Sequence, residues 1–257
     1  MTTSPRANSL ELAQRLGASA ALCHVVRAQS VSPSLTALTL SGPARALGGE
    51  PGNDVMLLVD ETDTHVVRRR YSVRSLEPER DELTLWVSTG HDGAGARFAR
   101  SAQAGQGVDV IGPRGKILIE PGVDWHLFVG DVSALGAFYR MAESLAPGAQ
   151  ALFVLEIPTP EDLLTPRLHE GVAVTGVFVD RAERAPRDPT GLLEALGALE
   201  LPGGAGHAYL FGEFGVIRSL GAALAERGMA REAVSSKAYW RAGRANADHG
   251  EPVKTEE

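Results

Sequence analysis

The chain has 257 residues, of which 44% are hydrophobic and 22% charged, so it is long enough for one large or two modest domains with a buried core. It carries 25 Lys and Arg against 32 Asp and Glu, and the net charge of −7 argues against general nucleic-acid binding, which needs a basic surface. The single cysteine excludes an internal disulfide framework and a site of paired thiolates, and no apolar run approaches the roughly 20 residues of a membrane span.

The first residues predict a short helix ahead of the main fold. Leu10, Ala13 and Leu16 recur at helical spacing between Asn8 and Gly17. Asn8 or Ser9 is the expected N-cap, because short polar side chains accept hydrogen bonds from the first turn. We therefore expect a leading helix within residues 1–19.

From about residue 20 to residue 120 the sequence predicts an all-β domain. Leu83, Leu85 and Val87 alternate with polar neighbours, as in a strand with one buried face. Short strands at close intervals are typical of an antiparallel barrel or sandwich. One helix is expected near residues 94–102. The predicted strands are LCHVVRAQSV, LTALTLSG, DVMLLVDE, HVVRRRYSV, ELTLWVST and GVDVIGP.

The second half predicts an α/β domain. Continuous apolar strands alternating with helices are typical of a parallel sheet with both faces covered. We expect a β-barrel over residues 20–122, an α/β domain over residues 123–245, and a polar tail over residues 246–257. The predicted strands are HLFVGD, ALFVLEI, VAVTGVFVD, HAYLFGE and SSKAYW, and the clearest helices are LGAFYRMAESL and GVIRSLGAALAERG.

The run RRYSVR, from Arg69 to Arg74, lies on a predicted strand of the barrel. Arg69 and Tyr71 share one face because side chains alternate along a strand, so a cation stands beside an aromatic ring. A flavin dinucleotide needs such a pair, with charge for its pyrophosphate and a stacking surface for its ring system. Ser72 points to the opposite face, from which its hydroxyl could reach the edge of a ring. On the motif alone, we slightly favour an edge strand protected by arginines.

Glycines precede the predicted helix at residues 94–102. In the run HDGAGARFA, Gly93 and Gly95 expose backbone N–H groups at the positive end of a helix dipole, an arrangement that binds phosphate. The run is not the Gly-x-Gly-x-x-Gly fingerprint, because Phe98 occupies the position of the third glycine. Taken alone, glycine before a helix is also common in ordinary loops.

The turn GDVSALG, from Gly130 to Gly136, follows the first strand of the α/β domain. A turn of small residues from the first parallel strand into a helix is the usual place for a nucleotide phosphate. We therefore favour a nucleotide site here over a simple loop. Gly212 and Glu213 follow a later strand, and we expect them to reach the same crevice at the carboxyl edge of the sheet.

The C-terminal run SKAYWRAGR interleaves aromatic residues with cations in an otherwise acidic chain. It could hold a ring or an acidic ligand. For Tyr239 and Trp240 taken singly, an amphipathic last strand whose aromatics cover the core is at least as good an explanation. Motifs of other enzyme classes are missing: the sequence has no Gly-x-Ser-x-Gly elbow, and His169-Glu170 lacks the second histidine of a zinc site.

Taken in this order, the four blocks resemble the siderophore-interacting protein family of the ferredoxin-reductase-like flavoproteins. The resemblance runs from about residue 20 to residue 252, and it is strongest in RRYSVR, WHLFVGD, HAYLFGE and KAYWRAGRANADHGE. It implies a FAD-binding β-barrel followed by an NAD(P)H-binding α/β domain, with no resident metal. It also implies reduction of a ferric siderophore to the ferrous form, which releases its iron.

The resemblance assigns roles residue by residue. Arg69 corresponds to the ligand of the flavin phosphate, Tyr71 to the residue that packs on the flavin, and Ser72 to the hydroxyl near the flavin N5, where hydride arrives. Tyr71 and Ser72 are thus the implied catalytic residues. The expected cofactor-binding residues are Arg69, Arg70, Tyr71, Ser72, Val73, His91, Gly93, Gly95, Ala96, Arg97, Phe98, Gly130, Asp131, Ser133, Ala134, Gly212, Glu213, Tyr239 and Trp240.

The chain departs from the family pattern at two places. The flavin loop usually carries a hydroxyl where this chain has Ala96, and that removes one phosphate hydrogen bond worth about 1.5–3 kcal/mol. In the nucleotide turn, Val132 replaces an acidic residue and Gly136 replaces a proline. Without the fixed φ of proline, the start of the following helix is less constrained.

A ferric siderophore is often anionic, so we expect a local basic patch despite the net negative charge. The expected substrate-binding residues are Arg74, Lys116, Lys237, Arg241 and Arg244.

Two other functions remain open at this point. One is a flavin reductase or diaphorase that serves a redox partner, and the other is a non-catalytic protein that only binds flavin or siderophore. The choice between NADH and NADPH depends on whether Arg181, Arg184 or Arg187 reaches a 2′-phosphate or lies in a solvated loop. We expect a cytoplasmic monomer without membrane insertion.

Overall fold

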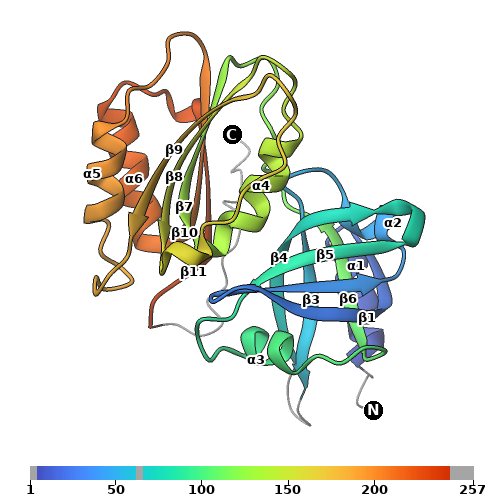
Figure 1. The fold of residues 1–257 in the computed structure, drawn as a ribbon. Helices are drawn as coiled ribbons and strands as arrows, with labels where there is room; N and C mark the ends of the chain where they lie inside the picture. The colour runs from blue at the N-terminus through green and yellow to red at the C-terminus, as the bar shows by residue number, and fades with distance from the viewer. Residues whose placement is uncertain (1–4, 62–65, 244–257) are drawn as a thin grey trace. The chain divides into compact units, whose positions relative to one another are not determined.

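The computed structural model describes residues 5–61 and 66–243. The chain divides into two compact units (Figure 1). The first comprises Met1–Ile119 together with Leu135–Met141, and the second comprises Glu120–Ala134 and Ala142–Glu257.

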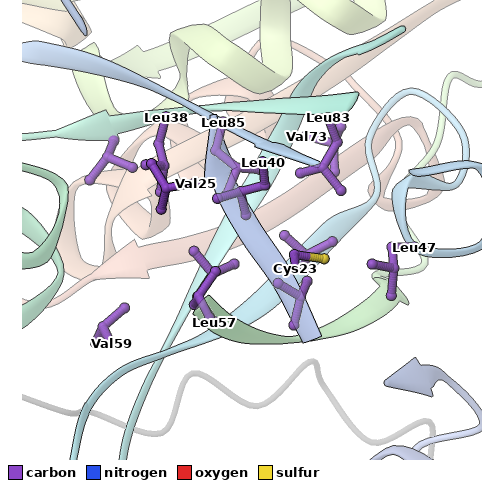
Figure 2. Close-up of a cluster of buried hydrophobic side chains, with 14 of the residues drawn as sticks. Cys23, Val25, Leu38, Leu40, Leu47, Leu57, Val59, Val73, Leu83 and Leu85 are labelled. Atoms are coloured by element: carbon purple, nitrogen blue, oxygen red, sulfur yellow. The ribbon is translucent and has the colours of Figure 1, made fainter. Parts of the chain in front are cut away.

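Six strands of the first unit close into an antiparallel barrel in the order β1-β2-β5-β4-β3-β6 (Figure 1). The predicted alternation is confirmed, because Leu83, Leu85 and Val87 of β5 are all buried. Figure 2 shows Leu83 and Leu85 gathered with Val73 and Leu40 in the barrel core. The strands are β1 (Ser19–Ser32), β2 (Leu35–Ser41), β3 (Asp54–Glu61), β4 (Val66–Glu77), β5 (Glu82–Ser88) and β6 (Gly107–Arg114).

The helices of the first unit correct one prediction. The leading helix begins at Pro5 rather than near Asn8, so the proposed cap at Asn8 or Ser9 is wrong. Pro5 suits the first helical position, where its missing N–H needs no partner. The Ser9 hydroxyl makes tertiary contacts from inside the helix: it donates to Asp109 Oδ2 at 3.3 Å and accepts from Arg68 Nη2 at 3.0 Å. The helices are α1 (Pro5–Arg15), α2 (Ala44–Gly48) and α3 (Ala94–Ser101), with a 3-10 turn η1 (Pro78–Arg80).

Five parallel strands form the sheet of the second unit, in the order β11-β10-β7-β8-β9. Helices α5 and α6 lie together on one face of it (Figure 1). The strands are β7 (Trp125–Asp131), β8 (Gln150–Ile157), β9 (Ala173–Asp180), β10 (Gly206–Glu213) and β11 (Val234–Trp240). The helices of the second unit are α5 (Thr190–Ala198) and α6 (Phe214–Glu226), with 3-10 turns η2 (Val132–Ala134), η3 (Pro160–Asp162) and η4 (Arg231–Ala233). Helix α4 (Leu135–Glu143) belongs to the first unit up to Met141.

Burial of this sheet is uneven across its strands. Strands β7, β8 and β10 are buried almost throughout, as expected for parallel strands covered on both faces. Strand β9 does not fit that expectation: Val174 and Phe178 are 51% and 43% exposed. The apolar sequence of β9 therefore predicts the strand correctly but not its burial, because β9 is an edge strand.

Aromatic rings form a ladder across β8, β7 and β10. Phe128 stacks on Phe153 and Tyr209, with ring centroids 5.1 and 5.2 Å apart, and His126 and His207 continue the ladder. Both histidines are buried, at 3% and 4% exposure. Two ionisable rings therefore lie in the apolar interior of the unit.

Mild acid should lower the free energy of unfolding because of these histidines. Burial, with a further effect from the neighbouring His207, lowers the pKa of His126 from 6.5 to about 4, and burial also lowers the pKa of His207. The unfolded chain takes up these protons near its ordinary pKa, whereas the folded chain keeps the rings neutral. Stability is therefore fully present above pH 6.5 and is lost as the pH falls toward 4, by up to about 3 kcal/mol for His126.

Urea unfolding at a series of pH values between about 7.5 and 4.5 measures this slope. The His126→Phe variant keeps an aromatic ring in the ladder and should have a shallower slope. An equal slope in the variant and the unsubstituted chain would contradict the role given to His126.

Candidate functional site

Arg69, Tyr71 and the start of α3 meet on one face of the barrel strand β4. A Cβ atom on Gly95 would collide with Tyr71 Oη and would lie 3.4 Å from Arg69 Cγ. The first turn of α3 can therefore approach these two side chains only because residue 95 is glycine. Burial raises the pKa of the Tyr71 phenol, despite the opposing effect of Arg69, so the phenol stays protonated.

The N-terminus of α3 is open to an anion. Gly93 is the N-cap residue and has no side chain to accept hydrogen bonds from the first turn. The backbone N–H groups of that turn point out of the helix, and with the helix dipole they favour a negative charge. Arg69 adds a full positive charge beside them. This cradle of glycine, helix N-terminus and arginine fits the pyrophosphate of a dinucleotide.

Arginines hold the loop before α3 in place. Arg100 Nη2 donates to Asp92 Oδ1 at 3.0 Å, and its Nη1 donates to the carbonyl oxygen of His91 at 2.8 Å. Arg97 Nη1 donates to the carbonyl oxygen of Asp92 at 2.6 Å. Sequence reasoning proposed Arg97 as a cofactor ligand and missed Arg100. The sequence signal for Arg100 is Asp92, eight residues earlier and just before α3, about two helical turns away.

His91 serves the same loop. Its Nδ1 accepts a hydrogen bond from the Gly93 N–H at 3.0 Å. Burial and then the charge of Arg100 lower the pKa of His91, so its ring is neutral at pH 7 and can accept this bond. Ala96 is buried, and Phe98 packs against the barrel core. The structure thus gives His91 and Phe98 structural contacts beside the proposed flavin loop.

Two other residues of the RRYSVR run, Arg70 and Val73, make contacts within the barrel itself. Arg70 forms a bidentate pair with Asp54, with Nε to Oδ1 at 3.0 Å and Nη2 to Oδ2 at 2.6 Å, and Asp54 is only 1% exposed. The side chain of Val73 lies in the barrel core (Figure 2). Val73 is among the expected cofactor-binding residues; because its side chain is buried in the barrel core, it could contribute to such a site only through its backbone. Ser72 is partly buried, and alternation places it on the opposite face from Tyr71.

The proposed substrate-binding cations have different surroundings. Arg74 lies over the Trp86 ring, with its Cζ 4.7 Å from the centroid, and Arg241 lies 4.8 Å from the Phe214 ring. Lys237 Nζ lies 5.7 Å from the Tyr239 ring. Lys116 is exposed in the segment after β6. Arg244, the fifth of these residues, lies outside the described residues, as does the predicted tail.

Asp131 organises the turn at the end of β7. Its Oδ1 accepts a hydrogen bond from the Ser133 N–H at 2.9 Å and another from the Ser133 hydroxyl. Its Oδ2 accepts from Trp240 Nε1 at 2.8 Å. Trp240 therefore ties the last strand to this turn. The next residue, Ala134, is fully buried, so its side chain is part of the core.

Gly212 and Glu213 end β10 next to the same turn. A Cβ atom on Gly212 would lie 2.7 Å from Asp131 Oδ2, and its φ of +153° is one that other residues rarely adopt. Glu213 is buried and caps α6: its Oε2 accepts from the N–H groups of Gly215 and Val216. Sequence reasoning proposed Glu213 as a cofactor residue and did not predict this cap. The sequence signal for this cap is the position of Glu213, two residues before the predicted helix that begins at Gly215.

The structure brings Gly130, Asp131, Gly212 and Glu213 together around one small pocket at the carboxyl edge of the sheet. This edge is where open parallel sheets bind their ligands. Glu156 from β8 and Arg181 after β9 also line it, and sequence reasoning missed Glu156. Tyr239 lies outside that lining and stacks on Phe211, with centroids 5.3 Å apart.

Within the described residues, no group of three or more His, Cys, Asp or Glu side chains could hold a metal ion. None of the helices in this part of the chain has the length and apolarity needed to cross a membrane.

Comparison with known families agrees with both halves of this description. Residues 123–243 match the family model "siderophore-interacting protein", and residues 53–117 match "siderophore-interacting FAD-binding domain". The chain belongs to the siderophore-interacting protein family. The resemblance found in the four sequence blocks is thereby confirmed.

Relatives of this family member include an enzyme named for its substrate. Ferric vibriobactin reductase ViuB of Vibrio cholerae is 31% identical over 183 residues, which are 69% of this chain and 66% of ViuB. A protein of Mycobacterium tuberculosis is 32% identical over 185 residues, which are 68% of this chain and 65% of that protein. The chain thus spans slightly less than two thirds of the length of these relatives.

Solved structures inside and outside the family share the fold. A siderophore utilization protein from T. fusca superposes with a TM-score of 0.80 at 26% identity, covering 90% of this chain and 96% of that one. The ferredoxin reductase of a carbazole 1,9a-dioxygenase has a TM-score of 0.67 at 18% identity, covering 87% of this chain and 70% of the other. The predicted ferredoxin-reductase-like fold, an antiparallel barrel plus a parallel α/β sheet, is confirmed.

Proposed function

We propose that this protein is a FAD-dependent oxidoreductase that moves electrons from NAD(P)H to a ferric siderophore and so releases Fe(II). The observation that carries the proposal is the cradle formed by Arg69, Tyr71 and the glycine-led start of α3. It lies in the part of the chain that matches the family's FAD-binding domain. The similarity to ViuB, a ferric vibriobactin reductase by name, supports the substrate class.

The residues present divide the work of holding FAD. The Arg69 guanidinium and the N–H groups at the start of α3 would neutralise the pyrophosphate, and Tyr71 would offer its ring as a packing surface. Ser72, on the other face of β4, would place a hydroxyl near the edge of the flavin. When bound, FAD supplies the means to accept two electrons from a nicotinamide and pass them on singly to iron.

In the second unit, the turn from Gly130 to Ala134 would receive the nicotinamide nucleotide. Asp131 keeps that turn in shape through Ser133 and Trp240. Gly212 leaves the space beside it clear. Val132 and Gly136, the two departures from the family pattern, lie in and just after this turn, so a variant restoring the family residue at either position should change the response to the nucleotide rather than the flavin content.

An anaerobic absorbance measurement tests the proposed function. The purified chain, loaded with FAD, should show flavin absorbance that decreases on addition of NADH or NADPH and returns on addition of a ferric siderophore. A chain that cannot be loaded with FAD, or whose flavin absorbance is unaffected by both nucleotides, would contradict the proposal. Flavin without response to nucleotides would instead favour a binding role.

A second candidate function is electron transfer to a protein or to free flavin. It is favoured by a similarity of 29% over 143 residues to the electron transfer subunit of dihydroorotate dehydrogenase B from Shouchella clausii, covering 54% of each chain. Equal turnover on free flavin, generic dyes and ferric siderophore would support this alternative. A clear preference for the iron chelate would exclude it.

Loss of charge at Lys237 or Arg241 should raise the KM for an anionic ferric chelate. Each cation lies against an aromatic ring, over Tyr239 or Phe214, and so presents its charge from a fixed position. Removing one such exposed charge costs about 1 kcal/mol or less, which is a two- to fivefold increase in KM. Steady-state kinetics of Lys237→Gln and Arg241→Gln measure it.

The matched control is Arg231→Gln, which removes the same charge from η4, at the other end of β11. Its KM should equal that of the unsubstituted chain. Unchanged KM values in the Lys237 and Arg241 variants, with flavin content intact, would remove both residues from the substrate site.

A further inference from the structure

Helix α4 follows the first strand of the parallel sheet in the sequence but packs with the barrel. Its residues Leu135–Met141 cluster with the first unit, whereas the turn Gly130–Ala134 directly before it belongs to the second. The turn that would receive the nicotinamide nucleotide is therefore continuous with a helix whose contacts lie on the proposed flavin barrel. Contacts of Gly136, Tyr139 and Arg140 attach the helix there.

Arg140 makes the polar contact between α4 and the barrel. Its Nη2 donates to the carbonyl oxygen of Gly49 at 2.6 Å, and its Nη1 donates to the carbonyl oxygens of Gly48 and Val73 at 3.1 and 3.4 Å. Gly48 and Gly49 end helix α2, whose last carbonyl groups lack partners within the helix and favour a cation. Burial and the nearby charge of Arg74 lower the pKa of Arg140 to about 10, so the guanidinium stays charged at pH 7.

Val73, whose carbonyl oxygen Arg140 contacts, lies at an irregularity of β4. The register of β4 against β5 shifts between Val73 and Ser75. Such a shift interrupts the ladder of backbone hydrogen bonds and bends the strand. It comes directly after Tyr71 and Ser72, the implied catalytic residues. Arg140 therefore holds β4 at the residue next to them.

An aromatic contact and a glycine complete the docking of α4. Tyr139, only 1% exposed, meets Trp86 of β5 edge to face, with ring centroids 5.9 Å apart. A Cβ atom on Gly136 would lie 3.3 Å from Trp86 Cβ and 3.8 Å from Arg74 Cβ. The glycine that replaces the family's proline therefore lets the first turn of α4 approach β4 and β5 closely.

We propose that Arg140 is a positioning residue for the transfer of hydride from the nicotinamide to the flavin. By fixing α4 to β4 and to the end of α2, it tethers the nucleotide turn to the strand that carries Tyr71 and Ser72. The proposal rests on the proposed function, since it assumes the donor at that turn and the flavin on that strand. Arg140 acts through α4 and takes no part in the chemistry.

Hydride transfer is sensitive to such tethering because the reacting atoms must come within about 3–3.5 Å of each other, and a misplacement of about 1 Å can cost about 100-fold in rate. A residue that only stabilised the barrel would act differently, since its loss would weaken FAD binding together with stability. Binding and the rate of reduction, measured on the same variant, therefore separate the two roles.

Arg140→Met removes the donors of the guanidinium and leaves an unbranched side chain in its place. Stopped-flow absorbance at saturating NADH, and again at saturating NADPH, gives the rate constant of flavin reduction, which should fall about 10- to 100-fold. The dissociation constants of FAD and of ADP-ribose should be unchanged. Reduction by dithionite, which needs no aligned nicotinamide, should keep its rate.

Hydrogen exchange adds a readout that needs no cofactor. Amides of α4 should exchange faster in Arg140→Met than in the unsubstituted chain, because the helix is held less firmly, while those of β7 should not change. Arg45→Met is the matched control: it makes the same substitution on α2, at an arginine whose side chain is 71% exposed and pairs with the exposed Glu79. It should alter neither the rate of reduction nor the exchange of α4.

Arg140→Lys is the second variant. It keeps the charge but offers one amine in place of the planar guanidinium, so its rate of reduction should lie between those of Arg140→Met and the unsubstituted chain. Thermal unfolding of each variant checks that it is folded. If Arg140→Met does not fold, Arg140→Lys decides the question.

The outcomes separate the inference from the proposed function. A folded Arg140→Met chain whose flavin is reduced at the unsubstituted rate overturns the inference alone, as does an unaltered rate in Arg140→Lys if only that variant folds. A loss of FAD affinity that accompanies the slower reduction, or an equal slowing with dithionite, also overturns it, because Arg140 would then merely stabilise the flavin site. If neither nucleotide reduces the flavin of the unsubstituted chain, the proposed function fails and the inference fails with it.

Discussion

Replacing Arg70 with methionine should destabilise the chain by about 3–5 kcal/mol, the usual cost of leaving a buried charge without its partner. Arg70 makes two hydrogen bonds to Asp54, whose carboxylate is 1% exposed in the wall of the barrel. Methionine fills similar space but donates nothing. The loss should appear as a lower urea midpoint for the barrel, with or without flavin present.

Arg69→Met is the matched comparison for Arg70→Met, since it makes the same substitution one residue earlier, on the other face of β4. The Arg69 guanidinium donates a hydrogen bond to the carbonyl oxygen of Arg68 at 2.8 Å. A hydrogen bond to a neutral group contributes about 1 kcal/mol, so the free energy of unfolding should fall by less than in Arg70→Met. The dissociation constant of FAD should instead rise about 10- to 100-fold, as expected when a charge-assisted phosphate contact is lost.

The predictions for Arg70→Met and Arg69→Met can be contradicted independently of each other. If Arg70→Met unfolds at the same urea concentration as the unsubstituted chain, the pair with Asp54 does not support the barrel. If Arg69→Met binds FAD with unaltered affinity, Arg69 is not the phosphate ligand. Fluorescence quenching on FAD addition and urea unfolding together distinguish these results.

Replacing Gly95 with alanine should weaken FAD binding by about 10- to 100-fold, because overpacking a close contact costs about 1–3 kcal/mol. The added methyl group would occupy the position of Tyr71 Oη. Either the ring of Tyr71 or the first turn of α3 must then move, and both belong to the proposed flavin cradle. The dissociation constant of FAD, measured by titration of the apoprotein, gives the effect.

A second substitution tests whether the loss of FAD affinity comes from the clash with the Tyr71 hydroxyl. Combining Gly95→Ala with Tyr71→Phe removes the hydroxyl that the methyl would strike, and the next ring atom, Cζ, lies 3.1 Å from the added carbon. Part of the FAD affinity should return. Gly197→Ala is the control, because its Cβ has open space in α5. Normal FAD affinity in Gly95→Ala would show that α3 does not shape the cofactor site.

Patterns that depend on neighbouring residues predicted the fold well. Alternation in β5 and the apolar runs of the parallel sheet identify strands from the local sequence, and the order of blocks indicates the family. Ser9 fits the pattern of a helix cap, but its hydroxyl bonds instead to Asp109, far along the chain. Nothing local to Ser9 signals that partner.

The sequence predicted the candidate site only in part, because some of its contacts also join residues that are far apart along the chain. RRYSVR identifies the strand but does not tell Arg69 from Arg70, because the difference lies in Asp54, sixteen residues earlier on β3. Glu156 went unnoticed since its partner Arg181 follows a different strand. The pairing register between strands determines which residues become partners of Arg70 and of Glu156. A single sequence does not reveal that register.

The exposed position of β9 has a consequence for how the second sheet opens. Within the described sheet, β9 is hydrogen-bonded only to β8, whereas β7 lies between β8 and β10. Few buried contacts and one unpaired edge characterise segments that open locally, without unfolding of the whole domain. Amide hydrogens of β9 would therefore exchange through small fluctuations, and those of β7 only through global unfolding. The strand that carries Arg181 at its end is thus the least protected segment of the sheet, and any ligand that reinforces the Glu156–Arg181 pair would slow exchange there first.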